Sequence, residues 1–293
     1  MIAGGLQSVA APRSPHINRV GIRADETRGP VVSGCMAAGF VYVRDDTSGP
    51  MAHATVGKRV ATGSLEPPWI VVNHSIERVI VARWPGRLFR VAIVPPRTDE
   101  EKAAMRRAAS ELQPTAGYTR ALAVDVLEEL PPSILFGPHG GAVVDVINVS
   151  RSLTEDTAAR LASARHPGAA DAYRRAWAQW LSADQERPVS EDHDVAGTLA
   201  AHGSGRSGSP IGAGLMVAYR AVTDSARLRG KADAITIDDE GDELISEPWS
   251  TAMAALLDAA MAVGAPDLVG DDAAVLTAAW RAVTGDDAPS AGP

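Results

Sequence analysis

The pattern of apolar and polar positions changes character once along this 293-residue chain. Over residues 20–94, short apolar runs are separated by Gly- and Pro-rich stretches, and in the run 88–94 every second residue is large and apolar. A period of two is typical of a half-buried strand, and the Pro95-Pro96 pair would end it. The sequence therefore predicts that strands dominate the first part of the chain.

Helical periodicity begins after Arg97. Thr98 and Glu101 have the spacing of a capping box, in which each side chain accepts a hydrogen bond from a free backbone N–H of the first turn, and Ser152 and Glu155 repeat the spacing. Apolar spacing predicts helical segments at 76–83, 99–112, 117–130, 141–150, 154–165, 168–182, 211–228, 248–263 and 271–284, and a short hairpin at 234–245. Strands followed by helices predict an α+β fold, with a small, mainly antiparallel sheet region followed by a mostly helical half.

Changes in pattern and composition also divide the chain into parts. The segment 202–214 is rich in Gly and Ser, which neither pack nor resist bending, so it is expected to be a linker. Read as a phosphate-binding loop, it would need a Lys-Ser/Thr ending and a preceding strand, and it has neither. We expect, in order, a flexible arm (1–17), an α+β domain (18–135), a helical extension (136–201), the linker, a C-terminal helical region (215–284) and a tail (285–293).

Composition narrows the range of functions. The chain has 28 Lys+Arg and 36 Asp+Glu, a formal net charge of -8, which disfavours binding to nucleic acid or to an anionic membrane. Because Cys35 is the single cysteine, the chain can form no internal disulfide and no zinc site with more than one sulfur ligand. No apolar stretch approaches the roughly 18 residues of a membrane helix, and the N-terminus does not resemble a signal peptide, so we expect a cytoplasmic protein.

Two common kinds of site are disfavoured by spacing. The acidic run 238–243 surrounds a glycine as a calcium loop does, but Trp249 stands where the bidentate Glu at the twelfth loop position would be, so a solvated hairpin turn is expected. The 7 histidines include no pair at the i, i+4 spacing of a helical metal site, and no G-x-S-x-G elbow is present. The sequence therefore predicts neither a metal site nor a hydrolase triad.

An arginine motif and a polar triplet follow one another within residues 20–135. The segment Ile-Arg-Ala-Asp-Glu-Thr-Arg-Gly-Pro contains Arg23 and Arg28, and a later strand runs into Asn73-His74-Ser75. This order resembles the NAD-dependent mono-ADP-ribosyltransferases of the cholera-toxin and pierisin type. In those enzymes an Arg-x-Asp-Ser-Arg-x-Pro segment ends the first core strand, and a Ser-Thr-Ser strand leads into a helix and another strand.

The resemblance implies a cofactor and a set of residues that bind it. Residues 18–135 would form an ADP-ribosyltransferase-like domain with NAD as its cofactor. Arg23 would grip the pyrophosphate through its planar fork of donors. Asn73, His74 and Ser75 would stand where the triplet of the family stands, close to the nicotinamide ribose.

The acidic motif of that family is missing from this chain. Its Glu-x-Glu or Gln-x-Glu turn, whose last Glu stabilises the positively charged ribose in the transition state, aligns with Ala121 and Ala123. Asp125, Glu128 and Glu129 are nearby carboxylates. Of these, Glu128 and Glu129 are the candidate catalytic residues, although they fit the exposed face of a helix equally well.

Three functional hypotheses follow. The first is an ADP-ribosyltransferase-like protein that binds NAD or another nucleotide, with the missing acidic motif arguing against transferase activity. The second is a non-catalytic interaction or regulatory protein whose helical half supplies the contact surface. The third, an enzyme acting on small metabolites, has no motif behind it. A nucleotide is the expected partner, with a protein acceptor or a homodimer as further partners and no membrane or nucleic acid.

Overall fold

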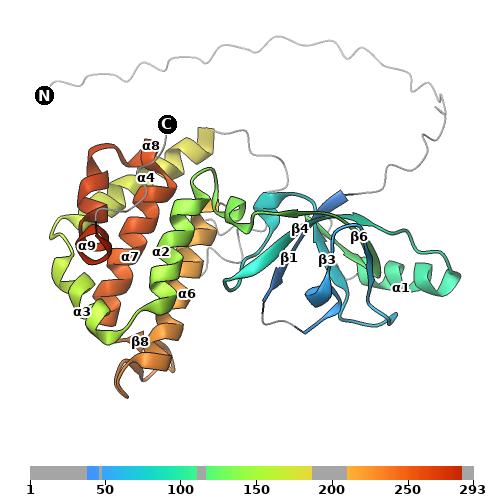
Figure 1. Cartoon of the computed structure of the whole chain (residues 1–293), viewed down its shortest axis with the longest axis horizontal. Helices are drawn as coiled ribbons and strands as arrows, with labels where there is room; N and C mark the ends of the chain where they lie inside the picture. The colour runs from blue at the N-terminus through green and yellow to red at the C-terminus, as the bar shows by residue number, and fades with distance from the viewer. Residues whose placement is uncertain (1–37, 46–47, 111–116, 187–209, 286–293) are drawn as a thin grey trace, which may run out of the picture. The chain divides into compact units, whose positions relative to one another are not determined.

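The computed structural model describes residues 38–45, 48–110, 117–186 and 210–285 (Figure 1). All of them belong to one compact unit, Met36–Pro293. The predicted arm, Arg23 and Cys35 lie outside the described residues. The α+β class is confirmed: a small antiparallel sheet occupies the N-terminal half, and most of the helices follow it.

The sheet has six strands, and every printed pairing within it is antiparallel. Its order is β2-β6-β4-β1-β3-β5. The strands are β1 (Ala38–Arg44), β2 (Arg59–Ala61), β3 (Ile70–Asn73), β4 (Gly86–Ile93), β5 (Tyr118–Ala121) and β6 (Ala123–Leu130).

Strand β4 is buried on both faces rather than on one. Phe89 and Val91 belong to a core on one side of the sheet, whereas Leu88 packs on the other side with Phe136 and its neighbours. The alternation of β4 was therefore predicted correctly, but its half-burial was not, because the helical half supplies apolar side chains to its second face.

The predicted helix at 117–130 is wrong, since these residues form β5 and β6. Strand β6 lies between β2 and β4, and its Val124 and Val126 are buried in the sheet core. Pairing with two neighbours and burial of alternate residues outweigh the helix propensity of its Leu and Glu residues. The segment 76–83 likewise contains only a short 3-10 turn, η2 (Ile76–Arg78), instead of a longer helix.

One of the two predicted capping boxes is confirmed. At the start of α1 (Asp99–Ser110), the N–H of Glu101 donates to Thr98 Oγ1 and the N–H of Thr98 donates to Glu101 Oε2, each with a donor–acceptor distance of 3.1 Å. The second box is wrong: Thr154 caps α3 by accepting from the N–H of Thr157 at 3.3 Å. Ser152 ends the preceding helix instead, and its hydroxyl donates to a carbonyl one turn back.

Helices make up most of the second half, close to the predicted bounds. They are α2 (Gly140–Ser152), α3 (Glu155–Ala164), α4 (Ala169–Glu186), α6 (Pro210–Arg229), α7 (Trp249–Gly264), α8 (Pro266–Val269) and α9 (Ala273–Thr284). The predicted hairpin is present as β7 (Ile235–Ile237) and β8 (Glu243–Ile245). Because α6 begins at Pro210, residues 210–214 of the predicted linker are helical, and 202–209 lie outside the described residues.

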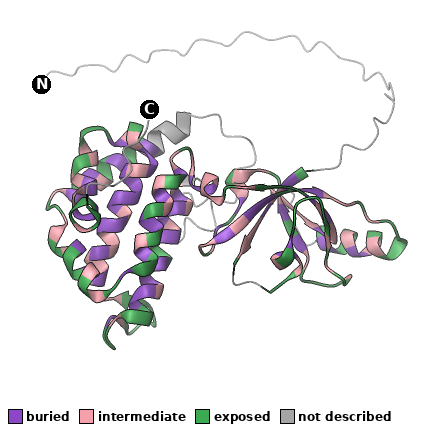
Figure 2. Ribbon diagram, in the orientation of Figure 1, coloured by how far each residue is buried: buried purple, intermediate pink, exposed green. Residues whose placement is uncertain are grey.

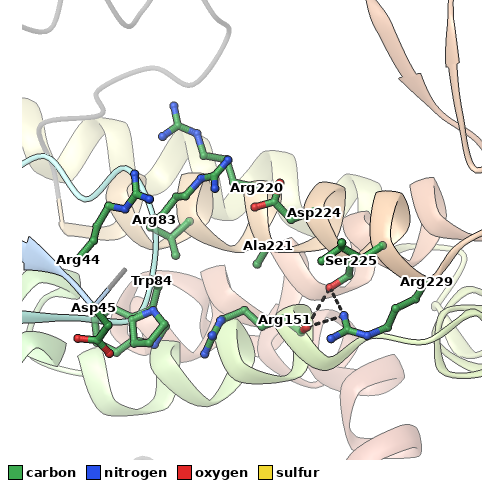
Figure 3. A pocket seen from close by; sticks show the side chains of 13 residues that line it. Arg44, Asp45, Arg83, Trp84, Arg151, Arg220, Ala221, Asp224, Ser225 and Arg229 are labelled. Carbon is green, nitrogen blue, oxygen red and sulfur yellow. Dashed lines mark hydrogen bonds between the residues drawn. The ribbon is translucent and has the colours of Figure 1, made fainter. Parts of the chain in front are cut away.

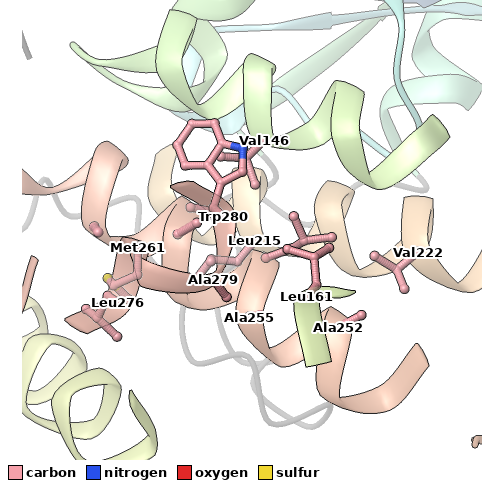
Figure 4. Close-up of a cluster of buried hydrophobic side chains, with 14 of the residues drawn as sticks. Val146, Leu161, Leu215, Val222, Ala252, Ala255, Met261, Leu276, Ala279 and Trp280 are labelled. Atoms are coloured by element: carbon pink, nitrogen blue, oxygen red, sulfur yellow. The ribbon is translucent and has the colours of Figure 1, made fainter. Parts of the chain in front are cut away.

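Helix α7 supplies much of the helical core (Figures 2 and 4). Leu256 and Met261 are fully buried there, and Trp280 of α9 packs into the same cluster. Alanines such as Ala252 and Ala255 allow neighbouring helices to approach closely. Within the described residues no single helix is long and apolar enough to span a membrane; α7 together with 266–284 has that length and composition, but the pair is bent by 105°.

A third cluster joins the sheet to the helices. Leu88 of β4 and Val81 pack with Phe136, the last residue of η3 (Pro132–Phe136), and with Val217 of α6. This contact fixes the 79–85 segment against α6, and the candidate site lies beside it.

Candidate functional site: an arginine-lined groove

A groove with a volume of about 470 Å³ lies where the segment before β4 meets α2 and α6 (Figure 3). Its sheet side is formed by residues 44–45 and 83–85. Its helix side is formed by the end of α2 and one face of α6. Five of the side chains that line it are arginines: Arg44, Arg83, Arg151, Arg220 and Arg229.

Helical periodicity brings one stripe of α6 to the groove. Val217, Ala221 and Ser225 are spaced four residues apart and are buried, so they hold this side of the helix against the rest of the protein. Arg220 and Asp224 precede two of these residues by one position and lie at the edge of the same face. Packing of the apolar stripe therefore determines which polar side chains of α6 face the groove.

The sheet side of the groove is held by two contacts. The hydroxyl of Tyr42 donates to the backbone carbonyl of Arg83 at a distance of 2.8 Å. The indole of Trp84 packs edge-on against Phe136, with ring centroids 5.3 Å apart and planes at 62°. These contacts position the backbone and the indole, while the Arg83 guanidinium extends from the exposed side of the segment.

Two of the arginines are tethered to neutral oxygens. Arg220 Nη1 donates to the carbonyl of Ala82 at 2.8 Å, which links α6 to the segment before β4. Arg229 Nη1 donates to the carbonyl of Arg151 at 2.9 Å and to Ser225 Oγ at 3.1 Å. Carbonyl and hydroxyl oxygens orient a guanidinium without neutralising it, so both side chains keep their full positive charge at the groove.

The charge of the groove is opposite in sign to that of the whole chain. Five arginines and two aspartates line it, a formal excess of three positive charges, whereas the chain carries -8. One of the aspartates, Asp224, also pairs with Arg227 at 3.4 Å, outside the groove. Among the residues that the structure describes, the guanidinium groups of Arg83 and Arg151 have no carboxylate partner. Such groups can bind a phosphate or carboxylate through two parallel hydrogen bonds.

The groove contains no activated nucleophile among the described residues. Ser225 is buried, and its hydroxyl donates to the backbone carbonyl of Ser150 at 2.9 Å instead of facing a base. The arrangement therefore suits binding of an anion better than covalent chemistry.

The predicted triplet lies elsewhere, at the end of β3. Asn73 Nδ2 donates to the carbonyl of Phe40 at 3.3 Å, and His74 Nε2 lies 2.7 Å from Thr119 Oγ1 on β5. Ser75 follows directly and precedes η2. None of the three lines the arginine-lined groove, and Nδ2 of Asn73 and Nε2 of His74 are already hydrogen-bonded to neighbouring strands.

The candidate acids Glu128 and Glu129 form exposed ion pairs with β4. Both carboxylate oxygens of Glu129 accept hydrogen bonds from Arg87, at 2.8 and 2.6 Å, and these bonds lower the pKa of Glu129 below its usual range. Glu128 lies 3.6 Å from Arg90. Asp125 accepts from Arg59 at 2.7 and 2.8 Å in the same way, which lowers its pKa as well.

The sheet order separates the triplet from these acids. Strands β1 and β4 lie between β3 and β6, so at the usual strand spacing the two groups are about 14 Å apart across the sheet. Ala121 ends β5 and pairs with Ile70, whereas Ala123 begins β6 and pairs with Ala61. The described structure thus does not bring the predicted binding and catalytic residues together, and Arg23 lies outside it.

The acidic run forms the turn of the hairpin between β7 and β8. Its carboxylates Asp238, Glu240 and Asp242 lie within 4.8 Å of one another. Asp238 Oδ1 accepts from the N–H groups of Glu240 and Asp242 at 3.0 and 2.8 Å, so this carboxylate caps the turn.

Sequence reasoning missed the groove because its arginines come from four separate elements and form no motif. Only the spacing of residues 217–228 on α6 carries a local signal, and it resembles that of any amphipathic helix. No family model matches this chain, and no curated protein or solved structure matches it either.

Proposed function

We propose that this protein binds a small molecule with clustered negative charge, phosphate groups above all, in the arginine-lined groove. The observation that supports the proposal is the formal excess of three positive charges among the lining residues of a chain whose net charge is -8. Arg83 and Arg151 supply guanidinium groups without carboxylate partners among the described residues. A volume of about 470 Å³ is in the range of small-molecule sites.

NAD and other nucleotides belong to this class of ligand, because each carries phosphate groups. The geometry favours binding over ADP-ribosyl transfer, since the carboxylates of Asp125, Glu128 and Glu129 are held in ion pairs with arginines. Transfer remains a prediction of the family resemblance. Nicotinamide release from NAD, compared between the wild type and the Glu128→Gln and Glu129→Gln variants, would reveal it.

Thermal unfolding of the full chain with inorganic pyrophosphate tests the binding proposal. A ligand present at 100 times its dissociation constant stabilises the folded state by about 2.7 kcal/mol. We expect pyrophosphate to raise the melting temperature, and sodium chloride at equal ionic strength to raise it much less, because chloride carries a single charge and has no pair of oxygens to match the guanidinium fork.

The Arg83→Ala/Arg151→Ala double variant should lose this stabilisation, since each charge-assisted hydrogen bond contributes roughly 1.5 to 3 kcal/mol. Arg106→Ala is the matched control, because Arg106 is an exposed arginine on α1 that does not line the groove. Equal stabilisation of the double variant and the wild type, or none in the wild type, would contradict the proposal.

A further inference from the structure

Trp84 gives the arginine-lined groove an aromatic surface. Its indole is half-buried, packs edge-on against Phe136 and lines the groove with its remaining surface. Packing on one side restricts the ring to one orientation. The groove therefore contains a preformed aromatic surface, which loses little conformational entropy when a ligand packs on it.

The guanidinium groups of Arg83 and Arg151 line the same groove as this aromatic surface. Arg83 is adjacent in sequence, and Figure 3 shows the Arg151 side chain reaching from α2 toward Trp84. A ligand packed on the indole would thus have donors for phosphate groups within the same groove. An inorganic anion gains nothing from contact with the apolar ring. An indole together with arginines therefore fits a ligand with one flat aromatic part and one anionic part.

The two carboxylates of the groove fit the same kind of ligand. Asp45 and Asp224 are acceptors only, and they would repel a second phosphate cluster. They can accept hydrogen bonds from hydroxyl or exocyclic amino groups. A nucleotide has ribose hydroxyl groups next to its phosphates, and adenine, guanine and cytosine bases also carry an exocyclic amino group.

We infer that the ligand of the groove is a nucleotide whose base stacks on Trp84 while its phosphates bind the arginines. This inference rests on the proposed anion binding and adds to it the class of ligand and the residue that recognises the base. Trp84 acts as a binding residue, and no bond of the ligand is made or broken.

Titration calorimetry of the full chain with ADP and with inorganic pyrophosphate tests the inference. ADP is expected to bind more tightly than pyrophosphate. Trp84→Ala should weaken ADP binding by roughly 5- to 150-fold, and change pyrophosphate binding by no more than about twofold, because only the stacked base depends on the indole.

Trp84→Phe keeps an aromatic ring and serves if the alanine variant fails to fold. It should retain a preference for ADP over pyrophosphate, and the part of the intrinsic fluorescence change that ADP causes through Trp84 should disappear. The same fluorescence change should persist in Trp177→Phe, because Trp177 stacks on Tyr173 in the helical half and does not line the groove.

The outcomes separate this inference from the proposal beneath it. Equal affinity for ADP and pyrophosphate in the wild type, unchanged in Trp84→Ala and with no fluorescence change assigned to Trp84, would overturn the inference and leave anion binding intact. Failure of both ligands to bind would overturn both.

Discussion

Burial controls the ionisation of two neighbouring side chains in the helical half. Asp258 of α7 is only 2% exposed, and Arg165 Nε donates to its Oδ2 at 2.8 Å. Loss of hydration raises the pKa of Asp258, and the hydrogen bond from Arg165 acts in the opposite direction. Burial also raises the pKa of Tyr173 from 10.0 to about 12, and the negative charge of Asp258 adds to this rise. Asp258 and Tyr173 are part of the helical half, and neither of them lines the groove.

Tyr173 should therefore ionise well above the usual range of a tyrosine. Its folded-state pKa lies above the unfolded value, so its contribution to stability is fully present below pH 10 and is lost as the pH rises toward about 12. In an alkaline titration followed by tyrosinate absorbance, with folding monitored by circular dichroism, Tyr173→Phe should remove a component that titrates well above pH 10. If Tyr173→Phe instead removed a component near pH 10, the buried environment assigned to Tyr173 would be wrong.

At the scale of elements, the start of α2 depends on close approach between backbones. A Cβ added at Gly140 would lie 1.8 Å from the carbonyl oxygen of Ser133, whereas a Cβ at Gly141 would meet nothing within 4 Å. Gly140 is buried against the η3 turn that also carries Phe136 into the third core cluster. The η3 turn and α2 therefore pack in a way that only glycine allows at this position.

This pair of glycines gives a matched test by urea unfolding. Gly140→Ala should destabilise the protein by about 1 to 3 kcal/mol, because the backbone must move to relieve the overlap. Gly141→Ala should leave stability unchanged or raise it by up to about 1 kcal/mol, because alanine favours helix and restricts the unfolded chain. Similar losses in both variants would show that helix formation, and not the contact with Ser133, governs this site.

The elements differed in how well the sequence predicted them. The helices after residue 140 were predicted because the apolar residues that recur at helical spacing are the residues that the fold buries. The cap formed by Thr98 and Glu101 was predicted because it depends only on residues three positions apart. Strands β5 and β6 were missed because their state depends on β2, β3 and β4, which are distant in sequence. Long-range pairing of this kind leaves little trace in a single segment.

At the scale of the whole molecule, the groove is a local reversal of charge. A net charge of -8 disfavours extended polyanions, which must approach a large part of the surface, but it does not prevent a small anion from entering a groove lined by five arginines. Composition alone predicted the first property and could not predict the second. Folding brings together arginines as distant in sequence as Arg44 and Arg229, so the site exists only in three dimensions.

A crystal structure of the full chain with pyrophosphate would show directly where the anion binds. We expect pyrophosphate in the arginine-lined groove, with its oxygens within hydrogen-bonding distance of the guanidinium groups of Arg83 and Arg151. Pyrophosphate bound instead at Asn73-His74-Ser75, or a groove that stays empty at a concentration that saturates the protein in solution, would contradict this expectation.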